Sequence, residues 1–155
     1  MTDAAKARQP RSLTARAIGY VARREYARAE LRQKLLATGA DRDAVEATLD
    51  ELAALGYLSD ARYAQAVVRQ KSGGYSKRAI AQTLKAKGVV GDAVTEALAE
   101  VEQDDDAALA VLWQRRFGRA PADDRERAQQ VRFLQSRGFG LSAIHKLLRD
   151  PPKDA

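Results

Sequence analysis

The stretch LRQKLLATGADRDAVEATL, residues 31–49, occurs in related form twice more along the chain and decides the fold. A shift of 49 residues places it on IAQTLKAKGVVGDAVTEAL, residues 80–98, and a further shift of 50 places it on QVRFLQSRGFGLSAIHKLL, residues 130–148. Most apolar residues keep their places in the three windows, and so does one glycine, at 39, 88 and 138. A pattern shared in this way indicates a tandem repeat with a period of about 50 residues.

The apolar residues of each window have helical spacing. Leu31 and Leu35 form one stripe, Val45 and Leu49 form the next, and the segments between breakers show no period-two alternation. The breakers lie close together, so the helices should be short. The pattern predicts helices near 12–24, 28–38, 42–55, 59–72, 76–87, 92–102, 104–117, 124–137 and 141–149.

Three helices per period give an all-α fold of three tandem three-helix repeats. We place the repeats at 12–58, 59–103 and 104–149, between flexible tails at 1–11 and 150–155. A unit of about 45 residues buries too little surface to be stable alone, so the repeats should stack with contacts mainly between neighbours. The expected shape is an elongated, curved helical array, right- or left-handed.

The ends of the predicted helices carry recognisable capping residues. The glycines at 39, 88 and 138 follow a helix rich in lysine or arginine, where a left-handed residue closes the last turn. Ser12, Ser59, Ser76 and Asp104 stand where a side-chain oxygen accepts a free amide hydrogen of the first turn. Trp113 and Phe117 are one turn apart and should lie in the core.

The residues needed for most enzyme chemistry are missing or isolated. The 155 residues contain no cysteine and a single histidine, His145, so no thiol site or Ser/His/Asp set can be assembled. The acidic residues at 100, 102 and 104–106 are interpreted as a solvated turn that suits the N-terminus of the next helix. Gly73-Gly74 lacks the order of a phosphate loop. We therefore predict no enzyme, no cofactor and no metal.

The composition also bears on location. The first residues, MTDAAKARQPRS, are polar, and no stretch approaches the ~20 apolar residues of a membrane span. The sequence therefore predicts a cytoplasmic protein without a membrane partner.

Positive charge is concentrated in the middle of the chain. Lysines and arginines number 27 against 21 acids, and residues 61–91 contain no acid at all. Such a run favours a surface for a polyanionic partner over a merely solvated helix face. Lys77 and Arg78 are the sharpest case, because two cations at the start of a helix oppose its dipole. The candidate partner-binding residues are Arg23, Arg24, Arg28, Arg62, Arg69, Lys71, Lys77, Arg78, Lys85 and Lys87.

Several strings resemble one known family. Residues 34–89 are similar to the central region of RecX proteins, and GYLSDARYA at 56–64, the lysine-glycine pair at 87–88 and RFLQSRGF at 132–139 carry the likeness. Arg23-Arg24-Glu25 ahead of Glu30-Leu31 belongs to it as well, and the whole spans residues 12–149. The resemblance implies an array of three-helix repeats that binds RecA filaments. It also implies inhibition of their strand-exchange, ATPase and coprotease activities in DNA repair, homologous recombination and the SOS response.

One position departs from the family's pattern. Members often carry serine where this chain has Ala27, and that serine would complete a capping box with Glu30. The aligned residue of the second repeat, Ser76, keeps the hydroxyl. The helix at 28–38 should therefore start less firmly here.

Two further function classes stay open beside a RecA regulator acting as a monomer. Three short helices per unit also describe helix-turn-helix modules, so the chain could bind single- or double-stranded DNA directly and without sequence preference. The helices at 42–55 and 92–102, which would read the groove, are acidic, and this disfavours close contact with phosphate. A purely structural scaffold would not need the charge asymmetry of the middle repeat.

Overall fold

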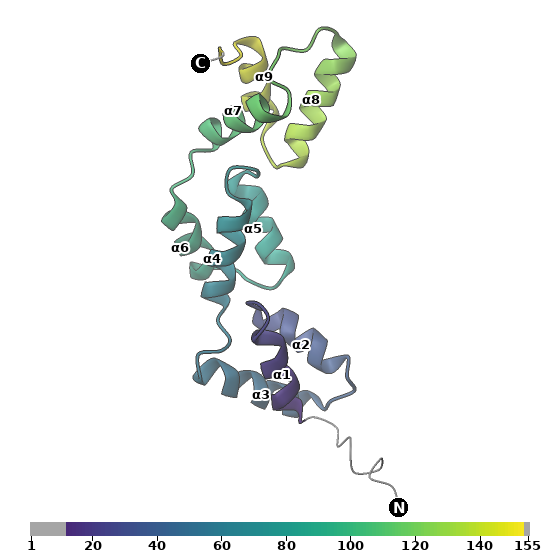
Figure 1. The fold of residues 1–155 in the computed structure, drawn as a ribbon, viewed down its shortest axis with the longest axis vertical. Coiled ribbons are helices and arrows are strands. Elements are labelled where there is room, and N and C mark those ends of the chain that lie inside the picture. Colours follow the sequence, from purple (N-terminus) through teal and green to yellow (C-terminus); the bar gives the residue numbers. More distant parts are fainter. Residues whose placement is uncertain (1–11, 154–155) are drawn as a thin grey trace, which may run out of the picture. The chain divides into compact units, whose positions relative to one another are not determined.

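The computed structural model describes residues 12–153, which form nine α-helices and no β-strand (Figure 1). The tail predicted at 1–11 lies outside the described residues, as do the final two residues, while residues 151–153 are described and not helical. The predicted all-α class is confirmed. The helices are α1 (Leu13–Val21), α2 (Arg28–Leu36), α3 (Arg42–Ala54), α4 (Asp60–Lys71), α5 (Lys77–Ala86), α6 (Asp92–Val101), α7 (Asp105–Arg116), α8 (Asp124–Ser136) and α9 (Leu141–Arg149).

The chain divides into two compact units, one up to Tyr63 and one from Ala64 onward. In the first unit α1, α2 and α3 pack against one another as a three-helix bundle (Figure 1). Leu31 and Leu35 of α2 meet Val45 and Leu49 of α3 in its core, and all four are fully buried. The apolar stripes read from the sequence are therefore the faces that these helices bury.

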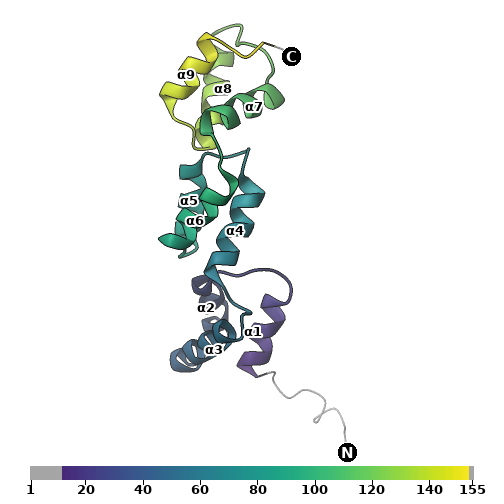
Figure 2. The ribbon, with the colours of Figure 1, turned by 90° about the vertical axis from the view of Figure 1, so that its left-hand side faces the viewer.

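The second unit holds most of α4 together with α5 to α9 (Figure 2). Trp113 of α7, Leu134 of α8 and Ile144 of α9 form the centre of one core cluster. In the preceding repeat α5 buries Ile80 and Leu84 completely, whereas α6 buries only Ala97. The third helix of this repeat is thus more exposed than its counterparts α3 and α9.

The predicted helix limits agree with the structure within one or two residues, except at the end of α1. That helix was expected to reach residue 24 and ends at Val21. Residues 22–24 form a turn, after which the Arg24 guanidinium lies 3.6 Å from the centre of the Tyr26 ring. The same guanidinium donates to the Glu30 carboxylate, so Arg24 gains contacts that a continued helix would not provide.

The predicted caps are confirmed. Ser12 accepts from the Ala15 amide at 3.1 Å, Ser59 from Arg62 at 3.2 Å and Ser76 from Ala79 at 3.1 Å. Asp104 accepts from the Asp106 and Ala107 amides at the start of α7. Gly88 and Gly138 have φ angles of 82° and 90°, and the amide that follows each returns to the last turn of its helix.

Ala27→Ser should stabilise the start of α2. Ala27 is the N-cap residue, its backbone is extended, and no side-chain hydrogen bond is made there. Ser76 holds the same place ahead of α5 and is equally buried. A hydroxyl that accepts from the Glu30 amide should raise the free energy of unfolding by about 0.5–2 kcal/mol. Chemical denaturation measures the gain, and Ser76→Ala is the matched control that should lose a similar amount. A lowered midpoint for Ala27→Ser would mean that the buried site has no room for the oxygen.

Candidate partner-binding surface

The ten predicted cations fall into two groups with different surroundings. Four of them belong to the first unit: Arg23, Arg24, Arg28 and Arg62. Arg23 is exposed and lines a shallow hollow with Arg16 and Tyr20. The other three form ion pairs inside their own unit.

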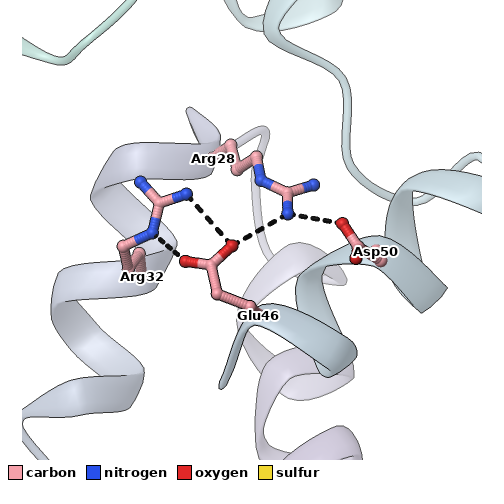
Figure 3. A network of polar contacts seen from close by, with 4 residues as sticks. All are labelled: Arg28, Arg32, Glu46 and Asp50. Atoms are coloured by element: carbon pink, nitrogen blue, oxygen red, sulfur yellow. Dashed lines mark hydrogen bonds and ion pairs between the residues drawn. The ribbon is translucent and has the colours of Figure 1, made fainter. Parts of the chain in front are cut away.

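Arg28 is the best connected of these arginines (Figure 3). Its guanidinium donates to Asp50 at 2.6 Å and to Glu46 at 3.1 Å, both on α3. Arg32, one turn further along α2, donates to the same Glu46 carboxylate. The network fastens α2 to α3 across their polar sides, so Arg28 has a structural role in the first repeat.

The two arginines also change the acidity of Glu46. Hydrogen bonds from Arg32, then those from Arg28, lower the pKa of Glu46 from 4.5 to about 2. The hydrogen bond to Asp50 in turn raises the pKa of Arg28. The network is therefore fully charged at neutral pH.

Glu46→Gln should make the stability of the first repeat less dependent on acid pH. A carboxyl whose pKa is lowered on folding contributes stability that is fully present above its unfolded pKa of 4.5. That contribution is lost as the pH falls through about 2. The stability difference between parent and variant should therefore be constant near neutral pH and shrink toward zero in strong acid, as measured by thermal melts across pH. Glu51→Gln, at an exposed residue of the same helix, is the control. A difference that persists unchanged in strong acid would contradict the assignment.

Arg24 and Arg62 join segments of the first unit that are distant in sequence. Arg24 pairs with Glu30 at 3.0 Å and covers the Tyr26 ring. Arg62, at the start of α4, donates to Glu25 at 3.0 Å and to the Gly56 carbonyl oxygen at 2.6 Å. Both arginines hold the turn between α1 and α2 in place.

The cations of the second repeat have a different environment. Arg69, Lys77, Arg78 and Lys85 are exposed, and none of them forms an ion pair with another residue of the described chain. Lys87 is also exposed, and Lys71 is half-buried with its ammonium nitrogen 4.5 Å from the centre of the Tyr75 ring. Arg69, Lys77, Arg78 and Lys85 thus leave their charges exposed to solvent, and the Lys71 ammonium lies over an aromatic ring. They are the part of the predicted site that the structure leaves available to a partner.

The expected conflict between Lys77, Arg78 and the dipole of α5 is offset by a carboxylate. The Lys77 amide donates to Asp105 at 3.2 Å, and Ser76 caps the Ala79 amide. A negative charge thus already lies at the positive end of the helix. The placement of two cations there costs less stability than the sequence suggested.

The sequence reasoning missed Arg137, Arg116 and Phe133. The Arg137 guanidinium lies 4.6 Å from the centre of the Tyr75 ring and 5.0 Å from that of Phe133. Arg116 lies over the same Phe133 ring at 5.0 Å. Together with Lys71 they form a cation–aromatic cluster, Lys71–Tyr75–Arg137–Phe133–Arg116. Arg137 stands in the RFLQSRGF string, but nothing local to that string points to Tyr75.

Residues considered for other chemistry have structural contacts. The Nδ1 atom of His145 lies 3.2 Å from the Arg127 guanidinium, and Asp104 and Asp105 serve helix starts. No group of three metal-binding side chains occurs among residues 12–153. Within the same range no helix is long and apolar enough to cross a membrane.

The fold and its exposed charges define a class of protein, namely a basic all-α protein built from three-helix units. Three family models match it in order: the first three-helix domain of RecX over residues 15–52, the second over 59–98 and the third over 103–148. The chain belongs to the RecX family.

Relatives and solved structures agree with this family. A "Regulatory protein RecX" from Ralstonia nicotianae is 43% identical over 142 residues, covering 92% of this chain and 89% of its own. Proteins of the same name from Leptothrix cholodnii and Chromobacterium violaceum are 43% and 41% identical, with coverage of 89% and 92% of this chain and 88% and 92% of their own. The crystal structure of RecX from Lactobacillus salivarius, 19% identical, superposes with a TM-score of 0.69 over 89% of this chain and 93% of that one. That structure supports the fold alone, while the relatives place the chain among regulatory proteins.

Proposed function

We propose that this protein binds the RecA nucleoprotein filament and lowers its recombinase, ATPase and coprotease activities in DNA repair and the SOS response. One observation carries the proposal beyond family membership. Within a stretch, 61–91, that contains no acid, the second repeat presents four exposed cations that form no ion pair among the described residues: Arg69, Lys77, Arg78 and Lys85. Charges that no intramolecular partner neutralises are available for an acidic surface or for phosphate.

The repeat architecture suggests how a small protein acts on a polymer. A chain of three successive repeats offers several contact surfaces, so one molecule can contact neighbouring RecA protomers. Such bridging would block incoming duplex DNA and hinder filament growth at less than one copy per protomer. We propose that the protein acts in the cytoplasm as a monomer and needs no cofactor.

Direct, sequence-independent DNA binding is the second candidate function. The same exposed cations favour it, because contacts to phosphate need no particular base sequence. The third helices disfavour the helix-turn-helix version. Asp43, Asp50 and Glu51 on α3, and Asp92, Glu96 and Glu100 on α6, are exposed acids.

Reversing two charges tests the proposal. The double variant Lys77→Glu/Arg78→Glu should weaken inhibition of RecA ATP hydrolysis and strand exchange by about tenfold at low salt. The loss should shrink as salt is added, because exposed charges are screened within about 10 Å at 0.1 M salt. The stability of the fold should be unchanged, because two effects oppose each other. Removing two cations from the start of α5 favours the helix dipole, while the new glutamates are repelled by Asp105.

The control places the same change at matched positions elsewhere. Arg42 is the first residue of α3 and Arg125 the second residue of α8, as Lys77 and Arg78 are in α5, and both are exposed. Arg42→Glu/Arg125→Glu should inhibit RecA like the parent.

Binding of the Lys77/Arg78 variant to naked single-stranded DNA separates the two candidate functions. Loss of both filament binding and DNA binding favours contact with phosphate, whereas loss of filament binding alone favours contact with an acidic RecA surface. Undiminished inhibition by the Lys77/Arg78 variant at every salt concentration would overturn the proposal.

A further inference from the structure

The loop between α4 and α5, residues 72–76, is held by residues that follow it by about 30 and 60 positions. The Gly73 amide donates to the Gln103 side-chain oxygen at 2.7 Å, and the Gln103 side-chain nitrogen donates to the Tyr75 carbonyl at 2.9 Å. The Ser76 amide donates to the Arg137 carbonyl at 2.9 Å. Both views show the loop at the end of its repeat that faces α7 and α8 (Figures 1 and 2).

Two further bonds extend this set on either side. The Arg137 guanidinium donates to the Gly74 carbonyl at 3.4 Å, and the Lys77 amide donates to Asp105 at 3.2 Å. Gln103 also donates to the same Asp105 oxygen at 2.8 Å, which ties the two supports together. Five consecutive residues, 73–77, thus have a main-chain group bonded to Gln103, Asp105 or Arg137.

The packing at this junction is close. Gly138 lies so near the start of α5 that an added Cβ atom would stand 2.4 Å from the Ala79 Cβ atom and 2.4 Å from the Ser76 hydroxyl oxygen. Gly39 occupies the equivalent place in the first repeat with a similar φ of 86° and open space around it. The glycine at 138 therefore serves an approach between repeats in addition to closing its own helix.

The loop is flanked by the cations of the proposed function. Arg69 and Lys71 lie in the last turn of α4, and Lys77 and Arg78 in the first turn of α5. Whatever holds residues 72–76 in one conformation also sets the spacing between these two pairs. Arg137 adds its own charge beside Tyr75, within the cation–aromatic cluster.

From this geometry we infer that the partner-binding surface is shared by the second and third repeats. Arg137 is a partner-binding residue, and Gln103 is a positioning residue that acts through the loop. The inference rests on the proposed function, because it assigns further residues to the same surface. A polyanionic partner would contact Arg137 together with the cations on both sides of the loop, and Gln103 would keep those cations at a constant spacing.

The experiment uses the full chain and has one measurement that needs no partner. Amide hydrogen exchange by NMR at Gly73, Ser76 and Lys77 should speed up in Gln103→Ala, while amides in the first unit keep their rates. Filament binding should weaken about threefold in Gln103→Ala and about tenfold in Arg137→Ala. Unchanged exchange at these three amides would overturn the positioning role of Gln103.

A double-mutant cycle distinguishes positioning from a separate contact. If Gln103 acts through the loop, Gln103→Ala should cost little further affinity once Lys77 and Arg78 have been reversed to Glu. Fully additive losses would contradict the inference. Full binding by both Gln103→Ala and Arg137→Ala, beside weakened binding by the Lys77/Arg78 variant, would overturn the shared surface and leave the proposed function standing.

A steric variant tests the same junction independently. Gly138→Ala should speed exchange in the loop and weaken filament binding, whereas Gly39→Ala carries the same backbone strain without the collision and should do neither. Equal behaviour of the two variants would show that the approach at Gly138 does not set the loop. If Gly138→Ala does not fold, Gln103→Ala still tests whether the conformation of the loop affects filament binding.

Discussion

Leu84→Ala is expected to lower the free energy of unfolding by about 2–5 kcal/mol, the usual cost of truncating a buried leucine. Leu84 is fully buried in α5, and its aligned partners Leu35 and Leu134 are equally buried in their repeats. The chain's single tryptophan, Trp113, lies in the same compact unit and is 1% exposed. Its fluorescence during chemical denaturation should report the loss, if the second and third repeats unfold together.

A matched leucine gives the control. Leu55 is 58% exposed at the end of α3, in the other unit, so Leu55→Ala should change stability by less than about 0.5 kcal/mol. The transition followed by Trp113 should not move in that variant. A loss below about 1 kcal/mol for Leu84→Ala would contradict the repeat alignment, which places Leu84 in the core.

Trp113→Ala should destabilise the third repeat by about 3–5 kcal/mol, because it removes the largest fully buried side chain of the unit. The indole nitrogen donates to the Gln130 side-chain oxygen at 2.9 Å, and Gln130 is itself buried. The variant therefore opens a cavity and also leaves a buried oxygen without its donor. Far-ultraviolet circular dichroism during denaturation measures the loss, since the fluorescent probe is gone.

Trp113→Phe separates the two contributions. It keeps an aromatic ring in the core and removes the N–H donor, so its cost should be about 1–3 kcal/mol. A loss as large as that of Trp113→Ala would mean that the hydrogen bond to Gln130 dominates over packing. A loss below about 1 kcal/mol for Trp113→Ala would mean that the third repeat does not depend on this core.

The two groups of cations show where reasoning from the sequence reached its limit for the site. All ten candidate residues carry the same kind of charge, and although the sequence singled out the acid-free run at 61–91, it did not show which of the ten are paired with acids. In the structure Arg24, Arg28 and Arg62 are paired with acids of their own unit, whereas Arg69, Lys77, Arg78 and Lys85 form no ion pair with another described residue. The difference depends on which acids the fold brings near each arginine.

The sequence by itself determined the class of fold, the helices and most of their ends, because these depend on short-range chemistry. Apolar spacing of three and four residues marks the buried face of a helix, and Ser76 or Gly138 closes a helix end through atoms only a few residues away. The limit predicted for the end of α1 was wrong: the helix ends at Val21, and Arg24 beyond it contacts the Tyr26 ring.

Only the tertiary structure decided the partners of the charged groups. Arg28 meets Asp50 across 22 residues, and Arg137 meets the Gly74 carbonyl across 63. No periodicity links such positions, since their approach depends on how whole helices pack. For that reason the basic run of 61–91 was visible in the sequence, while its support by Gln103 and Arg137 was visible only in the fold.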